Sequence, residues 1–397
     1  MMKSGWQTKS LGDVCKTGSG GTPLKSKKEF YENGTIPWLM SGEVSQGEVH
    51  FATRFITQKG LENSSARIFP KNTVLVAMYG ATAGQVGILK FEASTNQAVC
   101  GILPNEQFIP EFLYYLFLSK KDELILQATG NAQPNISQIK IKNTHVPIIK
   151  LGEQQRIVTI LDEAFAGIAT ATANAEKNLT NARELFQNYL QSTFSNKGDR
   201  WEEKTLKEVC AKITDGTHQT PKYFDSGVIF LSSRNVTSGK IDWDNIKYID
   251  EKQHLDMHKR VAPRIGDILL AKNGTTGVAA MVDRDLVFDI YVSLAHIRVL
   301  DKVSPEFMLY FINSPFAKKQ FNKRLKGSGV PNLHLEEIRE VVIPFPKSHE
   351  EQRQIVQKLD ELSNQTKKLE AIYQKKLVAL EELKKSILNQ AFSGQLQ

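Results

Sequence analysis

The sequence has 397 residues, of which 41% are hydrophobic and 24% charged, a balance typical of folded domains rather than disordered chains. No stretch approaches the roughly 20 uncharged apolar residues of a membrane helix, and the first residues contain no signal core, so we expect a cytoplasmic protein. Cys15, Cys100 and Cys210 are too few for a disulfide framework and lack zinc-site spacing. Lys and Arg outnumber Asp and Glu by 51 to 43, which is compatible with a polyanionic partner.

Repeats divide the chain into two similar halves. Residues 6–15, WQTKSLGDVC, align with residues 201–210, WEEKTLKEVC, at an offset of 195, and further paired motifs follow in both halves. The positive excess lies in residues 1–150, with 16 basic and 11 acidic side chains, and in residues 201–347, with 22 and 19. A period this long indicates duplicated domains rather than a solenoid.

Residues 1–150 are predicted to form a mixed α/β domain, and residues 199–347 a second one. Apolar runs at 73–77 and 267–271 lie between Gly, Pro, Asn and Asp turns and are typical of buried strands. Helical patterns follow in each domain, from about residues 110 and 305.

Residues 151–198 are predicted to form one long helix, and residues 348–397 another. Apolar residues recur at alternating spacings of four and three for about five heptads, interrupted once in each helix, at Asn178 and Lys376. Gly198 and Gly394 are expected to end the helices. The residues predicted to line the helix-pairing seam are Ile157, Leu161, Ile168, Leu185, Ile355, Leu359, Leu362, Leu369, Leu380 and Leu383.

The two helices are expected to pair with each other, because the first seam is rich in Ala and the second in Leu and Tyr. Chain order then requires antiparallel rods about 60 Å long. The predicted fold class is α+β, with two similar mixed α/β domains separated by two long helices that pair as an antiparallel coiled coil, and with a pseudo-two-fold internal repeat. In the alternative, each helix packs on its own domain.

Motifs of common catalytic sites are absent from the sequence. The only Gly-Lys pair, Gly239-Lys240, is followed by Ile241 rather than Ser or Thr, which excludes a Walker A loop. His254 and His258 have the spacing of a zinc-protease helix but lack its Glu, and are interpreted as a solvated helix face. There is no Asn/Asp-Pro-Pro-aromatic methyltransferase motif and no Gly-x-Ser-x-Gly elbow. We expect neither catalytic residues nor metal ligands.

Basic residues that could contact DNA phosphates occur in both halves. Residues 318–326 hold five cations and no acid after a Ser314-Pro315 helix start, with Phe321 on the opposite face. An amphipathic helix with outward cations suits phosphate contact, and a merely solvated face is the alternative. The predicted contacts to the DNA backbone are Lys25, Lys27, Lys28, Lys272, Lys319, Lys323, Arg324 and Lys326.

Polar loops at matching places in the two halves are candidate base readers. Matched turns hold Gly42-Glu43 in one half and Arg234-Asn235 in the other, and Arg, Asn and Glu suit guanine, adenine and cytosine respectively. Equivalent scaffolds with different donors and acceptors are expected of two readers of different sequences, while a neutral turn is the alternative for any single residue. The predicted base contacts are Glu43, Thr217, His218, Arg234, Asn235 and Asn273.

Three sets of residues carry a family resemblance that covers essentially the whole chain. They are residues 153–158, EQQRIV, with their repeat at 351–356, EQRQIV; the Gly-x-x-x-Pro-Asn loops at Gly130 and Gly327; and the Asp-Gly-Thr-His run at 215–218. With these motifs the tandem plan resembles the specificity subunit of type I restriction–modification enzymes, which act in phage defence. The loop at Gly18 departs from the Asp-Gly-Thr-His form.

The resemblance implies that residues 1–150 and 199–347 are target-recognition domains and that the long helices are spacers. It implies a non-catalytic subunit that reads the two halves of an asymmetric, bipartite site on double-stranded DNA. The implied partners are two methyltransferase subunits and two ATP-dependent restriction–translocase subunits, with no membrane. S-adenosylmethionine, ATP and magnesium are expected on those partners, and no cofactor on this chain.

Other functions remain open at this point. The chain could be a stand-alone sequence-specific DNA-binding or regulatory protein, or the specificity module of another phage-defence methyltransferase system. A helical scaffold with an incidental basic surface and an enzyme with an unrecognised site are further alternatives.

Overall fold

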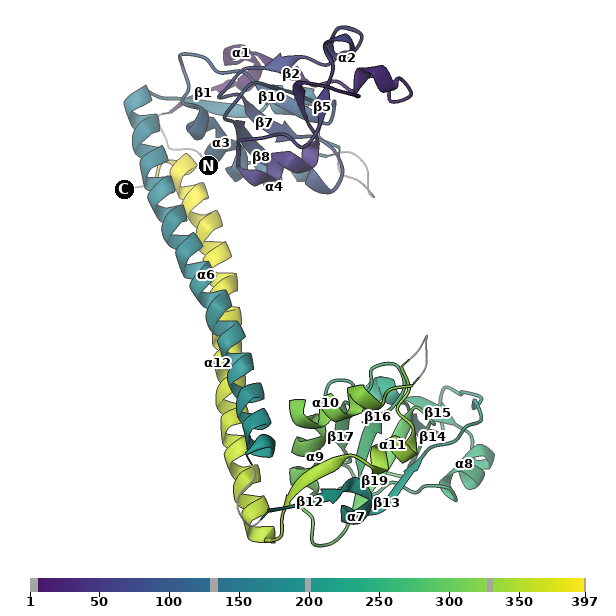
Figure 1. The fold of residues 1–397 in the computed structure, drawn as a ribbon. Coiled ribbons are helices and arrows are strands. Elements are labelled where there is room, and N and C mark those ends of the chain that lie inside the picture. Colours follow the sequence, from purple (N-terminus) through teal and green to yellow (C-terminus); the bar gives the residue numbers. More distant parts are fainter. Residues whose placement is uncertain (1–5, 129–134, 197–200, 327–330, 396–397) are drawn as a thin grey trace. The chain divides into compact units, whose positions relative to one another are not determined.

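The computed structural model describes residues 6–128, 135–196, 201–326 and 331–395 (Figure 1). The chain forms two compact units, one of Met1–Ala175 with Lys375–Gln397 and one of Glu176–Gln374. Each unit combines a globular domain with one part of each long helix, whereas the prediction treated each long helix as a separate segment. The loops at Gly130 and Gly327 and the predicted helix end at Gly198 lie outside the described residues.

The globular domain of the first unit contains two sheets and a separate strand pair. All its neighbouring strands are antiparallel except the pairs β4–β8 and β3–β9, which are parallel. The larger sheet has the order β2 (Thr17–Ser19), β10 (Val99–Ile102), β7 (Val74–Ala77), β8 (Val86–Leu89) and β4 (Glu48–Val49). The second sheet has the order β5 (Phe55–Ile56), β3 (Ile36–Leu39), β9 (Ala93–Thr95) and β6 (Ile68–Phe69). The separate pair consists of β1 (Gln7–Ser10) and β11 (His145–Ile148).

Short helices connect and cover these sheets. They are α1 (Leu11–Val14), α2 (Gln58–Glu62), α3 (Pro110–Ser119), α4 (Lys121–Leu126) and α5 (Gln138–Lys142), with 3-10 helices at η1 (Lys28–Phe30), η2 (Ser41–Gln46) and η3 (Gly80–Thr82). The Pro at the first position of α3 is suited to a helix start, because that position needs no backbone donor.

The globular domain of the second unit has the same plan. Its main sheet has the order β13 (Cys210–Asp215), β19 (Leu294–Val299), β16 (Ile268–Ala271) and β17 (Ala279–Met281). Its second sheet has the order β15 (Lys247–Ile249), β14 (Val228–Leu231) and β18 (Phe288–Ile290). Its strand pair consists of β12 (Trp201–Thr205) and β20 (Val342–Pro346). Its helices are α7 (Leu206–Val209), α8 (Glu251–His258), α9 (Pro305–Asn313), α10 (Pro315–Arg324) and α11 (Leu335–Arg339), with η4 at Ser233–Asn235.

The strand orders confirm the internal repeat. The order β2–β10–β7–β8 corresponds to β13–β19–β16–β17, and β5–β3–β9 corresponds to β15–β14–β18. The parallel pair also recurs at the same place, as β3–β9 and β14–β18. The first domain adds β4 and β6 at the sheet edges, so the two copies share one scaffold and differ at its margins.

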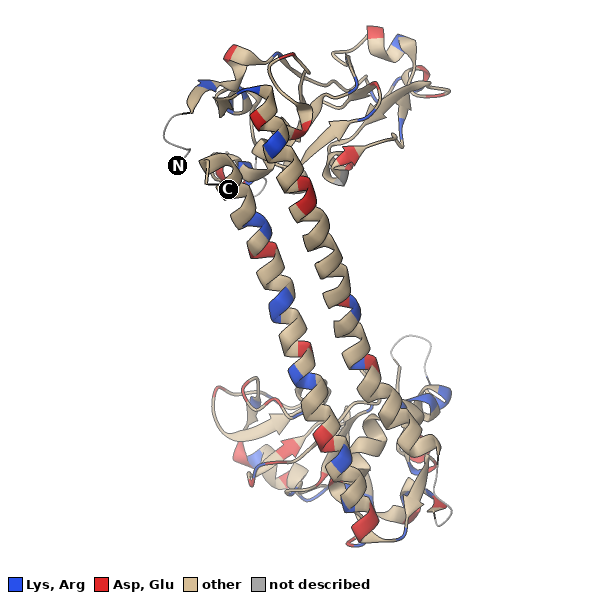
Figure 2. Cartoon of the chain, turned by 90° about the vertical axis from the view of Figure 1, so that its left-hand side faces the viewer, with Lys and Arg blue, Asp and Glu red and all other residues tan. Residues whose placement is uncertain are grey.

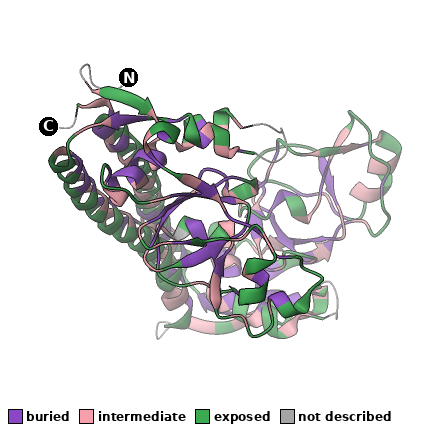
Figure 3. Ribbon diagram, turned by 90° about the horizontal axis from the view of Figure 1, so that it is seen from above, coloured by how far each residue is buried: buried purple, intermediate pink, exposed green. Residues whose placement is uncertain are grey.

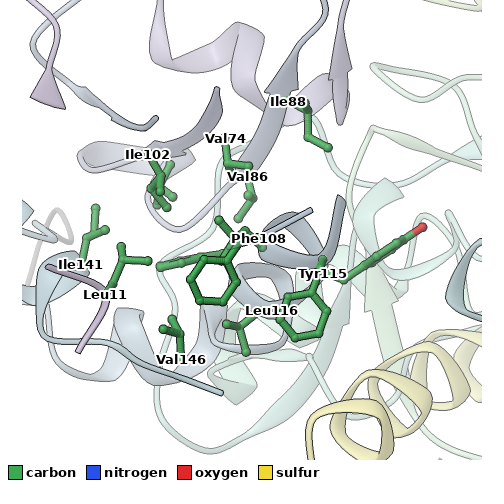
Figure 4. Packing of buried hydrophobic residues seen from close by; sticks show 14 of the residues in the cluster. Leu11, Val74, Val86, Ile88, Ile102, Phe108, Tyr115, Leu116, Ile141 and Val146 are labelled. Carbon is green, nitrogen blue, oxygen red and sulfur yellow. The ribbon is translucent and has the colours of Figure 1, made fainter. Parts of the chain in front are cut away.

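A fully buried strand lies in the main sheet of each domain and separates two apolar clusters. In β7, Val74 and Val76 belong to one cluster and Leu75 and Ala77 to the other, because alternate side chains of a strand point to opposite faces. Strand β16 alternates in the same way. Figure 4 shows Val74 in the first of these clusters, and Figure 3 shows that buried residues concentrate in the strands. Both predicted buried strands are therefore present.

The two long helices are α6 (Leu151–Ser195) and α12 (His349–Ser393). Gly394 follows α12 with a φ of 74°, the left-handed conformation that ends many helices, as predicted. Figure 2 shows Lys, Arg, Asp and Glu along both helices. No helix in the described ranges combines the length and apolar character needed to cross a lipid bilayer.

The two helices are antiparallel within each unit. In the first unit, Ile157 and Leu161 from the start of α6 share an apolar cluster with Leu388 and Phe392 from the end of α12. In the second unit, the end of α6 shares a cluster with the start of α12. The same clusters contain residues of the globular domains, so each helix pairs with the other helix and also packs on a domain.

The helix seam differs in phase from the predicted one. Leu185, Leu369 and Leu383 are 51%, 38% and 46% exposed, so these three residues do not belong to the seam. Phe186 is half-buried in place of Leu185, because its ring packs against that of Tyr310 at a centroid distance of 6.3 Å. The other predicted seam residues are buried or half-buried, namely Ile157, Leu161, Ile168, Ile355, Leu359, Leu362 and Leu380.

The prediction that Asn178 and Lys376 interrupt the apolar seam is wrong. Both residues are exposed, and the adjacent Leu179 and Leu377 are half-buried at the positions that continue the spacing of four and three. Small polar residues such as Ser363 also lie buried in the seam. The heptad pattern is therefore continuous, and its phase is set partly by residues that a search for large apolar side chains ignores.

The repeated Glu-Gln motif anchors each long helix to its domain. The buried Gln154 accepts a hydrogen bond from the backbone N–H of Ile109 and donates to the carbonyl oxygens of Gln107 and Ile149, at 2.8–3.0 Å. Gln352 makes the corresponding three hydrogen bonds in the second unit. Recurrence of the motif at an offset of 198 thus has a structural cause, since a buried amide with unpaired atoms would be costly.

A second repeated contact lies about two helical turns further along each long helix. The hydroxyl of Tyr115 donates to Asp162 at 2.5 Å, and that of Tyr310 donates to Asp360 at 2.5 Å. Burial, reinforced by the adjacent carboxylate, raises the pKa of both tyrosines. Each hydroxyl therefore stays a donor that joins a helix of the globular domain to a long helix.

Candidate DNA interface

A glycine-bracketed loop follows the first strand of the main sheet in both domains. In the second unit, β13 ends at Asp215, and a Cβ on Gly216 would lie 1.9 Å from the carbonyl oxygen of Ile290. In the first unit, a Cβ on Gly20 would lie 2.2 Å from the carbonyl oxygen of Thr95. Only glycine permits so close an approach, so each loop is fixed against the end of a strand in the second sheet.

The buried side chain of Asp215 pairs with cationic and imidazole groups beside the loop of the second unit. This buried carboxylate lies 2.5 Å from Nη2 of Arg260, 3.1 Å from Nζ of Lys272 and 3.3 Å from Nε2 of His218. Burial opposes its ionisation, but the hydrogen bonds and charges of Arg260 and Lys272 outweigh burial and lower the pKa of Asp215. The structure does not support the predicted phosphate contact at Lys272, because its ammonium group is buried against Asp215.

The outer side of this cluster is cationic. Arg260 and His218 are exposed, whereas Thr217 is half-buried and its hydroxyl accepts a hydrogen bond from the backbone N–H of Gln219. Thr217 also forms a backbone bridge with Tyr291, which places the loop beside the pocket described next. His218 stays a candidate base contact on this rim.

A concave pocket of about 490 Å³ lies over the second sheet of the second unit. Its walls include the rings of Tyr223, Phe230 and Tyr291 and the cationic side chains of Arg234 and Lys247. Nζ of Lys247 lies 3.9 Å from the centroid of the Tyr223 ring, which is a cation–π contact. Aromatic faces and cations in one concavity suit a nucleic acid, because they offer stacking surfaces together with donors for base edges and phosphates.

Glu43 and Asn235 stabilise their own turns, so the structure does not support their predicted role as base readers. The carboxylate of Glu43 is buried and accepts hydrogen bonds from the backbone N–H groups of Met40 and Thr53, at 2.7 and 2.9 Å. The buried amide of Asn235 accepts from the backbone N–H of Ser232 at 2.9 Å and donates to two carbonyl oxygens. Their hydrogen-bonding groups are already occupied.

Asn273 lies in the turn after β16 and forms a backbone bridge with Asn332. The side-chain oxygens of both residues are buried and accept no hydrogen bond from the described residues. Such oxygens are unusual in a folded domain. The predicted base contact at Asn273 stays a prediction.

Helix α10 is amphipathic as predicted. Phe321 is buried on one face, and Lys318, Lys319 and Lys323 are exposed on the others. Ser314 caps the helix by accepting a hydrogen bond from the backbone N–H of Ala317 at 3.1 Å. The exposed lysines remain available to phosphates.

Two other predicted phosphate contacts next to α10 have partners inside the protein. The guanidinium group of Arg324 donates to the carbonyl oxygens of Gln320 and Glu340, at 3.2 and 3.3 Å. Nζ of Lys326 pairs with the carboxylate of Glu337 at 2.6 Å. Lys319 and Lys323, together with the neighbouring Lys318, are therefore the better candidates.

The first unit also has exposed cations among the predicted phosphate contacts. Lys25, Lys27 and Lys28 are all exposed, and Nζ of Lys27 lies 5.2 Å from the centroid of the Phe30 ring. Lys120, near the start of α4, pairs with Glu123 at 2.7 Å. The predicted phosphate contacts of this domain thus lie on the loop before η1 and at its first residue, Lys28.

Sequence reasoning missed four residues of this surface: Tyr223, Lys247, Arg260 and Tyr291. Tyr223, Lys247 and Tyr291 come from separate parts of the chain and meet only when β14 pairs with β15 and β18, whereas Arg260 contacts Asp215 at the end of β13. Lys247 begins β15, and Tyr223 precedes the backbone bridge of Phe224 with Tyr248, so the contact between them follows from strand pairing that the sequence does not reveal.

His254 and His258 do not form a solvated face as predicted. Their side chains are 12% and 31% exposed, and both face the buried Asp289. The spacing of i and i+4 put them on one helix face, but only the fold shows that β18 lies beneath it.

The fold defines a duplicated α+β protein in which two domains of one scaffold alternate along the chain with two long helices. A profile described as "Type I restriction modification DNA specificity domain" matches residues 3–180 and, a second time, residues 198–379. The chain therefore belongs to this family and holds two copies of its domain.

Curated relatives agree with this assignment over the full chain. The specificity subunit of the type I restriction enzyme MjaIX from Methanocaldococcus jannaschii is 26% identical, with 99% of this chain and 94% of the relative covered. The EcoKI specificity subunit from Escherichia coli strain K12 is 22% identical, with 100% and 90% covered.

Solved structures share the fold over their whole length. A chain from a study of complex assembly and conformational transition in a type I restriction–modification system has a TM-score of 0.81, at 22% identity and with 100% of both chains covered. The HsdS subunit from Thermoanaerobacter tengcongensis has a TM-score of 0.64, at 20% identity and with 100% and 98% covered.

Proposed function

We propose that this chain is the non-catalytic specificity subunit of a type I restriction–modification complex, and that each globular domain reads one half of an asymmetric, bipartite site on double-stranded DNA. The observation that carries the proposal is the duplicated scaffold with different surface residues. The same strand order recurs in both domains, yet the matched turns differ at an exposed position, which is Gly42 in the first domain and Arg234 in the second.

Charge supports DNA as the ligand of each domain. The excess of basic residues lies in residues 1–150 and 201–347, and the exposed lysines of α10 and of residues 25–28 provide phosphate contacts. The pocket with Arg234 and Lys247 provides a place for base readout, because Arg can donate two hydrogen bonds to guanine in the major groove.

The proposal includes the partners of the chain. Two methyltransferase subunits and two restriction–translocase subunits would assemble on it, and those partners would carry S-adenosylmethionine, ATP and magnesium, while this chain carries no cofactor for the reaction. A cytoplasmic location, where chromosomal and invading DNA are accessible, is part of the same proposal.

A domain exchange tests the two-reader model. Residues 201–347 are replaced by the corresponding residues of another specificity subunit, and the methylated motif is mapped across a genome by sequencing. One half of the motif should change while the other half and the gap remain. A motif in which both halves change, or neither half changes, would overturn the model.

Co-purification separates this proposal from a stand-alone DNA-binding protein. The tagged chain is expressed together with the proteins encoded next to its gene. It should form a stable complex with a methyltransferase subunit, and the two should elute together in gel filtration. Specific DNA binding by the chain without any such partner would favour the stand-alone alternative.

A further inference from the structure

Three aspartates of the second unit are almost completely buried, and two of them pair with permanent cations. Asp215 lies against Arg260 and Lys272, as described above. Asp267 lies 2.7 Å from a guanidinium nitrogen of Arg298, and its pKa falls to about 2 because the hydrogen bonds and charges of His296 and Arg298 outweigh burial. In both cases a nearby cation offsets the cost of burying a carboxylate.

Asp289 is the third, and its side-chain partners among the described residues are two histidines. Its carboxylate is 1% exposed. Oδ2 accepts a hydrogen bond from Nδ1 of His254 at 2.7 Å, and Oδ1 accepts one from Nδ1 of His258 at 3.1 Å. One nitrogen of each ring and one carboxylate oxygen all lie within 4.8 Å of one another. The buried charge of Asp289 therefore faces two imidazoles rather than Lys or Arg.

The local fold directs these three side chains toward one point. Phe288 and Ile290 of β18 point into the apolar core, so Asp289 between them points to the opposite face of the strand. His254 and His258 are four residues apart on α8 and therefore lie on the same side of that helix, which packs on β18.

Helix α8 has little else to hold it in place. It has eight residues, none of them buried, and its Leu255 is exposed. Helices this short are marginal without tertiary anchoring. Besides the histidines, Gln253 exchanges two hydrogen bonds with the backbone of Lys222, at 2.9 and 3.1 Å. Polar contacts to β18 and to this loop thus replace the apolar packing that anchors helices elsewhere in the domain.

We propose that His254, His258 and Asp289 bind one divalent cation of the zinc class, which fastens α8 to β18. Two imidazole nitrogens and one carboxylate oxygen are typical zinc ligands, and a 2+ ion balances a buried carboxylate. Ligand atoms about 2.0–2.2 Å from a tetrahedral zinc lie about 3.3 Å apart, so modest side-chain rotation closes the present arrangement. The partly exposed His258 leaves a solvent molecule room to complete the coordination.

Binding requires a lone pair on each ligating nitrogen. In the described geometry the Nδ1 atoms donate to Asp289. When the cation enters, the proton of each neutral ring resides on Nε2 instead, so no proton is lost from a neutral pair and one is released if a ring starts out protonated.

Metal titration of the full-length protein tests the site without DNA. The chain is treated with EDTA, dialysed, and titrated with zinc in competition with a chromogenic chelator, and cobalt is used separately for its visible absorption. One zinc per chain should bind. The variants His258→Gln and Asp289→Asn should each lose more than the roughly 10- to 100-fold in affinity that removal of a ligand's hydrogen-bonding partner costs.

The control is His50→Gln, which removes an exposed histidine that pairs with Glu48 in the first unit. This variant should keep the wild-type zinc affinity and stoichiometry. Should Asp289→Asn fail to fold, the partly exposed His258→Gln, checked by circular dichroism, decides the question. Unchanged zinc binding in folded His258→Gln protein, or no zinc binding by the wild type, would overturn the proposal. Because no DNA is present, neither result bears on the proposed function.

Discussion

At the scale of single residues, burial decides which predicted base readers can face DNA. Glu43 and Asn235 have suitable donors and acceptors, but backbone groups of their own turns already use them. Arg234 comes from the same turn as Asn235 and stays exposed in the pocket. A sequence reveals the hydrogen-bonding capacity of a side chain, whereas its availability depends on neighbours that only the fold supplies.

Arg234→Ala should relax the sequence preference of the second domain at one base pair. If Arg234 donates to a guanine edge, its loss removes roughly 1–3 kcal/mol of discrimination at that position and leaves the others unchanged. Binding is measured against a panel of duplexes that carry single base-pair substitutions in both half-sites.

Arg284→Ala is the matched control, because Arg284 is an exposed arginine of the same domain whose guanidinium lies over the Trp243 ring, 5.5 Å from its centroid. This variant should keep the wild-type preference at every position. A loss of affinity in Arg234→Ala that is equal for all duplexes would instead make Arg234 a phosphate contact.

At the scale of elements, the sequence predicted the long helices and their antiparallel pairing but not the phase of their seam. Leu179 and Leu377 continue the heptad pattern, whereas Leu369 points outward. Apolar residues occur on more than one face of these helices, so the pattern alone permits neighbouring phases. Contacts with the globular domains, such as that of Phe186 with Tyr310, select one of them.

Helix α10 should contribute affinity without specificity. Changing Lys318, Lys319 and Lys323 to Ala should weaken binding to all duplexes about equally, because phosphates are the same in every sequence. The slope of log affinity against log salt concentration should flatten by about one for every phosphate that the variant no longer binds. Titrations of specific and unrelated duplexes at several salt concentrations measure both effects.

A charge-matched control changes three exposed lysines of α12, Lys367, Lys368 and Lys375, to Ala. This triple variant loses the same net charge but should keep the wild-type salt slope. An equal flattening in both triple variants would show that net charge, and not the position of α10, determines the salt dependence.

At the scale of the whole molecule, duplication was the strongest signal in the sequence. Aligned motifs at offsets of 195 and 198 predicted two similar domains, and the recurring strand orders agree. The orders themselves were not predictable, because β3 pairs with β9 across more than 50 residues and short apolar runs do not specify partners. The pocket depends on such long-range pairing and was missed for the same reason.

The paired helices are expected to fix the distance between the two half-sites. Each helix has 45 residues, which corresponds to about 68 Å at a rise of 1.5 Å per residue. Two readers on one face of a duplex address half-sites that lie about one helical turn of DNA, or a multiple of it, apart. The native methylation motif should therefore have two parts at such a spacing, with a constant number of unread base pairs between them, because the paired helices are stiff. Mapping methylated sites across a genome measures this gap.

Insertion of four residues after Thr180 of α6 should change the gap or abolish methylation. The insert adds about 6 Å and rotates everything beyond it by about 40°, and it breaks the register in which Arg183 pairs with Glu370 at 3.0 Å. An equal insert after Tyr373 of α12 should restore that register, so the double insert should do less harm than the single one. If a folded single-insert protein methylates sites with the native gap, or if the native motif is continuous, the helices do not set the distance between the readers.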